Sequence, residues 1–257
     1  DAPFICNVSV ENLPSETGLK KSLEVARLAL TAISLVWQLP STILDGLNLV
    51  YDRRPYRKEV VSFASHGMVG GGGKWSQRNL HGIHLKPNDT WDKIHKEYKA
   101  IFLIYGQVLD YALNPSQQTT RREIFSTLLQ SLTWFHAACR EEDNLISVVK
   151  YAACLDALAS GGKTNGIERL ISKQLGIDSQ THLFKSVDKS VKEIVKEVYS
   201  DARSRTIHGT NDKLGHDWTT TRTQAEIISR ICLIHCISSV AEDEDLIDPK
   251  NFMAERT

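Results

Sequence analysis

Long hydrophobic runs are absent from this chain of 257 residues. No window approaches the ~18 uninterrupted apolar residues that a membrane-spanning helix needs. No charged segment followed by an apolar one opens the chain, so we expect no secretory signal, no membrane partner and a cytoplasmic location. Because the first residue is Asp1 rather than methionine, we expect the sequence to be a fragment or to lack disordered ends.

Charge of one sign is not in excess, and cysteine is scarce. The 31 basic and 31 acidic residues cancel, so no global field recruits nucleic acid, and such a function needs a local basic patch. The five cysteines are scattered, and four of them lie in apolar helical patterns. They are Cys6, Cys139, Cys154, Cys232 and Cys236. This usage favours reduced core residues over a disulfide framework.

The common enzyme motifs are missing as well. The chain has no Gly-x-Ser-x-Gly elbow, no His-Glu-x-x-His helix and no dinucleotide fingerprint. Gly70–Lys74 fails as a phosphate loop, because Met68 stands at the first glycine position and Trp75 follows the lysine. We expect the glycine run to be a flexible turn or loop. Cys232 and Cys236 continue one apolar helix face, which favours core packing over a metal site. We expect no metal and no cofactor.

Residues 114–118 break the helical pattern with polar residues and a proline, and we place a domain boundary there. Residues 1–118 mix strand and helix signals, which predicts an α+β accessory or sensor region. Its expected strands lie at Phe4–Val10 and Glu59–Ala64, and its expected helices lie at Gly18–Gln38 and after the cap Asn88–Thr90.

Residues 119–257 have helical patterns throughout. We expect helices at about 120–140, 143–160, 165–175, 183–208 and 223–241. Thr120–Glu123 and Thr223–Glu226 have the pattern of capping boxes, and Glu242–Asp245 is typical of a solvated tail. The predicted fold class is therefore mainly α, a helical bundle preceded by an α+β region.

The expected helix 183–208 carries a row of cations. At ~100° per residue, five of them fall within about 60° of one another. They are Lys185, Lys189, Lys192, Lys196 and Arg203. Val187, Val191, Ile194, Val198 and Ala202 follow another face and are expected to pack into the core. The row is either a solvated lysine face or a track for an RNA backbone that leads to Arg203 and His208.

Arg203 and His208 combine a cation for a phosphate with an imidazole that moves protons near neutral pH. Gly209 can end the helix directly after them. Five residues of an ideal helix rotate about 140°, so the two side chains would diverge. Either the helix distorts or ends before Gly209, or two copies of the site converge across a symmetric dimer. His216–Trp218, shortly after the motif, is a further segment that could flank a site.

Arg203–Gly209 resembles the Arg-x4-His signature of HEPN domains, and its Arg-Ser-x-x-x-His-Gly form is most similar to the ApeA-like branch. Upstream, Tyr151–Leu158 resembles that branch's Leu-Glu-x-Leu helix. Asp156 stands there where the family usually has a glutamate. The resemblance covers roughly Thr119–Val240, about half of the chain.

The resemblance implies a helical bundle that forms a homodimer and cleaves RNA without a metal, often as a toxin or an anti-phage effector. Arg203 would stabilise the phosphate, His208 would be the catalytic histidine, and Asp156 would orient one of them. Attack by the ribose 2′-OH would leave a 2′,3′-cyclic phosphate and a 5′-OH end. The residues expected to bind RNA are Lys189, Lys192, Lys196 and Arg205.

Two questions stay open at this point. Residues 1–118 carry no family signature, and they would sense a phage trigger, bind an activating partner or dock on the helical domain. The rival to an enzyme is a non-catalytic HEPN scaffold that mediates dimerisation or binds a nucleotide or a partner. The presence of both Arg203 and His208 favours the enzyme, whereas the neutral net charge favours the scaffold.

Overall fold

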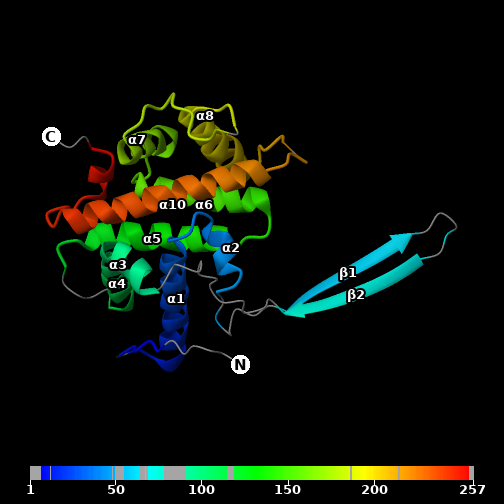
Figure 1. Ribbon diagram of the computed structural model, residues 1–257, viewed down its shortest axis with the longest axis horizontal. Helices are drawn as coiled ribbons and strands as arrows, with labels where there is room; N and C mark the ends of the chain where they lie inside the picture. The colour runs from blue at the N-terminus through cyan, green and yellow to red at the C-terminus, as the bar shows by residue number, and fades with distance from the viewer. Residues whose placement is uncertain are drawn as a thin grey trace.

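A computed structural model shows a mainly helical protein (Figure 1). It describes residues 7–11, 13–47, 49, 55–63, 67, 69–77, 91–114, 119–185, 187–213 and 215–254. At the centre lie α5 (Arg122–Cys139), α6 (Asn144–Leu158) and α10 (Thr219–Glu242). Fully buried side chains such as Leu132 and Phe135 join them, and a change like Leu132→Ala would cost about 2–5 kcal/mol of stability.

Aspartate side chains define the start of two of these central helices. The Asp143 carboxylate accepts a hydrogen bond of 2.8 Å from the backbone N–H of Ile146 and caps α6 where the sequence predicts it. Before α10, Asp217 accepts from the N–H and the hydroxyl of Thr219. This helix therefore begins four residues earlier than expected.

Neither predicted capping box forms. Thr223–Glu226 lies inside α10, and the buried Glu226 carboxylate instead accepts from the N–H and the hydroxyl of Ser41, at 2.7 and 2.8 Å. At Thr120–Glu123, no side chain caps α5, and the Arg121 N–H donates to the Thr119 hydroxyl. At α10 other contacts thus occupy the groups that a capping box would use, since the Thr223 hydroxyl donates to the Thr219 carbonyl and the Glu226 carboxylate accepts from Ser41.

The helices of the first half pack on the same bundle. They are α1 (Ser15–Ser34), α2 (Pro40–Leu44), α3 (Trp91–Glu97) and α4 (Lys99–Leu113). Leu28 of α1 and Val108 of α4 belong to one hydrophobic core with Leu128 of α5. The expected boundary at 114–118 thus does not separate two cores, and the accessory role of residues 1–118 stays a prediction.

Strands β1 (Pro55–Phe63) and β2 (Val69–Gln77) form an antiparallel hairpin that extends away from the helices (Figure 1). β1 starts four residues before the expected strand. The glycine run Gly70–Gly73 is part of β2, so the expected loop is wrong there, and Val61 pairs with Gly71. Residues 7–10 form no strand, and the rest of the expected strand at Phe4–Val10, like the cap at Asn88–Thr90, lies outside the described residues.

The expected helix 183–208 begins only at Val191. Ser190 and Glu193 form a capping box there, with the Ser190 N–H donating to the Glu193 carboxylate at 2.8 Å. Three segments follow without a break, namely α8 (Val191–Val195), the π-helix η2 (Lys196–Ser204) and α9 (Arg205–Ile207). Lys185 and Lys189 precede the helix, so the prediction of a single five-cation helical face is wrong for these two lysines.

The apolar face of the same segment is confirmed from Val191 onward, because Val191, Ile194, Val198 and Ala202 are buried, whereas Val187 precedes the helix and is only half-buried. Two short elements complete this side of the bundle. α7 (Lys163–Leu175) ends as expected at Gly176, whose φ of +65° suits glycine. The 3₁₀ turn η3 (Pro249–Phe252) follows the exposed run Glu242–Asp245, and it buries Phe252.

By length and composition alone, α10 and the sharply bent pair of α6 and α7 have the character of membrane spans among the described residues. In α10, 56% of the apolar window is buried inside the bundle. Its place at the centre of the core accounts for its apolar character, since a buried helix is hydrophobic on most sides.

Candidate active site

The π-helix η2 is the element from which the candidate site is built. π-helices are rare, because their i→i+5 hydrogen bonds widen the turn, and they occur frequently at functional sites. Two rows of polar side chains leave η2, each made of residues four apart. Glu197 and Asp201 form the first row, and Tyr199 and Arg203 form the second.

Arg203 of the second row borders a cavity of about 890 Å³ between α5 and α6. Two of the three predicted catalytic residues, Asp156 and Arg203, line it together. Ala153 and Ala157 of α6 also line it, and their small side chains leave room above the helix. The cavity therefore joins two segments that are far apart in the sequence but carry the two halves of the family resemblance.

Arg203 holds an incompletely satisfied charge at this cavity. Its guanidinium carbon lies 5.0 Å from the centre of the Tyr199 ring, a cation–π contact. Its Nε atom is buried and has no hydrogen-bond partner, and within the described part of the chain no carboxylate forms an ion pair with Arg203. A buried donor without an acceptor costs about 1–3 kcal/mol, which an incoming anion would relieve.

Asp156 acts on Arg203 through a tyrosine that the sequence reasoning missed. The Asp156 carboxylate accepts from the N–H of Lys163 at 2.9 Å. Burial raises the pKa of Tyr199, the nearby charge of Asp156 raises it further, and Arg203 lowers it. The Tyr199 hydroxyl therefore stays protonated near neutral pH, between the opposite charges of Asp156 and Arg203. The available signal was the spacing of Tyr199 four residues before Arg203.

His208 lies apart from this cavity within the chain. It is exposed at the end of α9 and is not among the residues that line the cavity. Gly209 ends the helix with a φ of +67°, as predicted. The neighbouring Ile207 exposes 56% of its surface. One chain therefore brings Arg203 and Asp156 together and leaves His208 on a separate, partly apolar surface.

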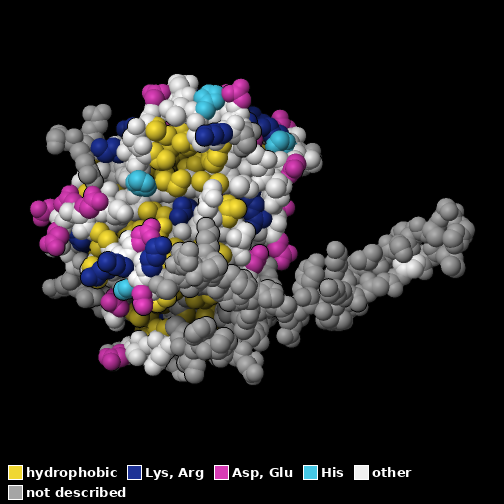
Figure 2. All heavy atoms as spheres, viewed as in Figure 1, with side chains coloured by type: hydrophobic (Ala, Val, Ile, Leu, Met, Phe, Trp, Pro, Cys, Tyr) yellow, Lys and Arg dark blue, Asp and Glu magenta, His cyan; other side chains and the backbone are white. Residues whose placement is uncertain are grey.

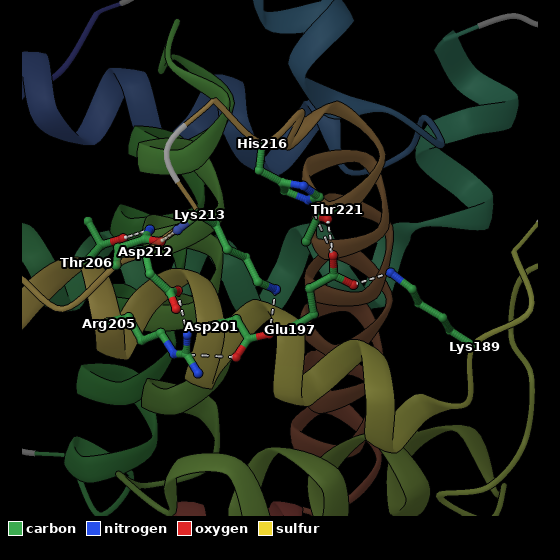
Figure 3. A network of polar contacts seen from close by, with 10 residues as sticks. Lys189, Glu197, Asp201, Arg205, Thr206, Asp212, Lys213, His216 and Thr221 are labelled. Atoms are coloured by element: carbon green, nitrogen blue, oxygen red, sulfur yellow. Dashed lines mark hydrogen bonds and ion pairs between the residues drawn. The ribbon is translucent and has the colours of Figure 1, made fainter.

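The first row of η2 forms a closed network of ion pairs (Figure 3). The Glu197 carboxylate is largely buried, pairs with Lys189 at 2.5 Å and accepts from the Thr221 hydroxyl at 2.9 Å. His216 Nε2 lies 4.0 Å from the same carboxylate. Glu197 thus fixes the segment before α8 and the first turn of α10 onto η2.

Asp201 continues this network in the next turn of η2 (Figure 3). Its carboxylate pairs with Lys213 at 2.8 Å and lies 3.8 Å from Arg205 Nε. Arg205 also pairs with Asp212 at 2.6 Å. All the charges of this row have partners, so the row holds the loop after α9 in place.

The four residues expected to bind RNA fall into two pairs. Lys189 and Arg205 are held by carboxylates, whereas Lys192 and Lys196 are exposed and form no ion pair with another described residue. On the face shown in Figure 2, basic and acidic side chains are interspersed rather than gathered by sign. The RNA-binding role of all four stays a prediction.

His216–Trp218 borders a second cavity of about 630 Å³ beside the closed network. The rings of His216 and Trp218 meet edge to face, 4.6 Å apart, and Lys213 lies 5.8 Å from the Trp218 ring. Thr206 and Gly209 also line this cavity. The segment lies beside the end of the motif but does not line the cavity of Arg203, and its place at a functional site stays a prediction.

Cysteines and possible metal ligands do not add to the site. Within the described ranges, no three His, Cys, Asp or Glu side chains are grouped closely enough to hold a metal ion. Cys139, Cys154, Cys232 and Cys236 are buried free thiols, which confirms their predicted role in the core. Burial raises the pKa of Cys232 to about 12, so its reactive thiolate form is suppressed.

With this geometry in view, comparisons with protein-family models, curated proteins and solved structures found no match for the chain.

Proposed function

We propose that this protein is a metal-independent endoribonuclease of the HEPN type. Residues 119–257 would form the ribonuclease domain of a homodimer, and residues 1–118 would form an α+β region that receives an activating partner or a phage trigger. A toxin or an anti-phage effector is the role that this design suits. The observation that carries the proposal is Arg203, a cation that pairs with no carboxylate of the described residues and shares a cavity with Asp156.

Arg203 suits the phosphate of an RNA backbone, because its planar fork of donors matches phosphate oxygens. The ribose 2′-oxygen attacks phosphorus, a new P–O2′ bond forms, and the bond to the 5′-oxygen breaks. His208 accepts the 2′-hydroxyl proton and returns it to the departing 5′-oxygen. DNA lacks the 2′-hydroxyl, so the reaction is restricted to RNA. Asp156 positions Arg203 through Tyr199.

A homodimer supplies the missing proximity between Arg203 and His208. A two-fold interface brings the same patch of two chains together. The exposed Ile207 offers an apolar side chain next to His208 for such a contact. In this arrangement, Arg203 of each protomer faces His208 of the other, and the catalytic centre is complete only in the dimer.

A non-catalytic scaffold is the second candidate, and one observation favours it. His208 lies outside the cavity that holds Arg203 and Asp156. If the dimer does not bring these residues together, the helices would serve dimerisation, and the cavity would bind a nucleotide or a partner without cleaving it.

The deciding experiment incubates the purified protein with total RNA in the presence of EDTA and maps the new ends. We expect cleavage that leaves 2′,3′-cyclic phosphate and 5′-hydroxyl ends. Cleavage that EDTA abolishes and that leaves 5′-phosphate ends would contradict the mechanism. Intact RNA after incubation with a dimeric protein would favour the scaffold.

A further inference from the structure

A single tryptophan, Trp134, stands at the cavity of Arg203 with its ring surface available. It exposes 40% of its surface and lines the cavity from α5. No ring or cation of the described residues stacks on it, whereas Trp91 contacts His95 and Phe102 and Trp218 contacts His216. Exposed aromatic surface beside a charged cavity is a typical feature of ligand sites.

We infer that Trp134 stacks on one unpaired nucleobase, and that the cavity therefore takes single-stranded RNA. The inference rests on the proposed function, because it names the form of RNA that the same site binds. It adds a base-binding position to the phosphate position at Arg203.

The spacing of the lining residues suits a nucleotide. The ring contact between Phe135 and Tyr151, at 5.5 Å, shows that the end of α5 lies beside the first half of α6. Ala153 lines the cavity two residues beyond Tyr151, and Asp156 follows about 4.5 Å further along the axis at 1.5 Å per residue. Trp134 and Arg203 line this same cavity of about 890 Å³, which has room for a base on the ring and a phosphate at the guanidinium.

The charge balance of the cavity makes stacking necessary. Arg122 and Arg203 oppose Glu123 and Asp156 along its lining, so the formal charges cancel. A cavity without excess positive charge attracts a polyanion only weakly, because the affinity for phosphates grows with the number of cations that neutralise them. Stacking on an aromatic ring needs no net charge and accepts any base.

Stacking on Trp134 also selects single strands over duplexes. In a double helix each base is stacked between its neighbours, and its faces are closed to a protein side chain. An unpaired base exposes both faces, and one of them can lie on Trp134. The competing use of an exposed tryptophan is a contact between the two subunits, and the experiment below distinguishes it.

The test measures fluorescence anisotropy with a labelled 2′-O-methyl oligoribonucleotide, which binds but cannot be cleaved at its blocked 2′-oxygens. We expect Trp134→Ala to weaken binding about 5- to 100-fold, the range for losing one stacked base, and Trp134→Phe to retain most of the affinity. Trp91→Ala is the matched control, because Trp91 is 44% exposed on α3 and does not line the cavity; its affinity should equal the wild type. A duplex of the same sequence should bind more weakly than the single strand.

Unchanged affinity of Trp134→Ala, or equal binding of duplex and single strand, would overturn the inference. Sedimentation of Trp134→Ala as a monomer while the wild type is a dimer would assign Trp134 to the subunit interface instead. Binding that depends on Trp134 in a protein that never cleaves unmodified RNA would support this inference and defeat the proposed function. Cleavage at the normal rate by a Trp134→Ala protein with normal affinity would support the proposed function and defeat this inference.

Discussion

The two polar rows of η2 leave the same helix but differ in how far their charges are satisfied. Glu197 and Asp201 each have at least two partners, and together they hold three neighbouring segments (Figure 3). Arg203 has an aromatic ring below it and a buried donor without an acceptor. Complete polar networks make a structure rigid, whereas an unsatisfied group at a cavity is available to a ligand. We therefore assign stability to the first row and chemistry to the second.

The largest expected effect is a loss of RNA cleavage when Arg203 of the second row or His208 is replaced. Arg203→Ala and His208→Ala should each lower RNA cleavage by about 10²-fold or more, the scale of a lost general acid–base group or phosphate contact. His208 is exposed at a helix end, so unfolding transitions should stay unchanged. His235→Ala changes another exposed histidine, on α10, and should cleave like the wild type. A wild-type rate for His208→Ala would remove that residue from the mechanism.

A change in the first row should instead lower stability and leave RNA cleavage unchanged. Glu197→Ala leaves Lys189 and Thr221 without their acceptor, and we expect a loss of about 1–3 kcal/mol in the free energy of unfolding. The Lys189 side chain is 40% exposed, so solvent reduces its share of this loss. Urea titration measures the change as a shift of the midpoint, while the cleavage rate of the folded fraction stays constant.

Glu16→Ala is the control for Glu197→Ala, since Glu16 and Lys20 form a highly exposed pair on α1. It should change stability little. If Glu197→Ala proves as stable as the wild type, or if it loses cleavage with normal stability, the division between the two rows does not hold.

The lysines allow a finer separation of the same two roles. Replacing Lys192 and Lys196 together with glutamine should weaken RNA binding several-fold and reduce the salt slope of log K by up to about 1.4, at 0.7 per phosphate contact. Lys189→Gln should lower stability instead, because Lys189 pairs with Glu197. Affinity measured across a salt titration tests both. An unchanged slope for the double variant would show that Lys192 and Lys196 are only solvated.

The smallest expected effect is on the pH dependence of stability, and it concerns the buried carboxylate of Glu226. Glu226 accepts from the N–H and the hydroxyl of Ser41. Unlike Glu197, it forms no ion pair with another described side chain. Burial raises its pKa above the ordinary value of 4.5, although the Ser41 donors lower it. The folded state then binds more protons than the unfolded state between 4.5 and the folded pKa, so stability falls as pH rises through that window. Urea titrations at several pH values should show a flatter profile for Glu226→Gln. Identical profiles would contradict the assignment.

The sequence predicts the helix ends and the buried helix face, because both depend on local sequence pattern. The apolar period finds the buried row Val191, Ile194, Val198 and Ala202, and single residues mark helix ends at Asp143, Gly176 and Gly209. The false start of the motif helix at Leu183 is also a local error. Its lysine spacing fits a helix, but Ser190 and Glu193 form the capping box that sets the true start.

The remaining features depend on tertiary contacts that periodicity does not reveal. Glu226 has the spacing of a capping box, yet its acceptor role is fixed by Ser41, 185 residues away in the chain. Tyr199 gains its role only because the π-helix places it between Asp156 and Arg203. Whether Arg203 and His208 meet depends on a second chain, which one sequence does not specify.

Mixing two inactive variants tests most directly whether Arg203 of one protomer acts with His208 of the other. Arg203→Ala and His208→Ala proteins are mixed, allowed to exchange subunits, and assayed on RNA under conditions where the wild type is dimeric. A shared centre predicts recovery to about a quarter of the wild-type rate, because half of the dimers are mixed and each mixed dimer contains one complete centre. No recovery in a mixture that demonstrably contains heterodimers, or full cleavage by a protein that sediments as a monomer, would contradict the composite site.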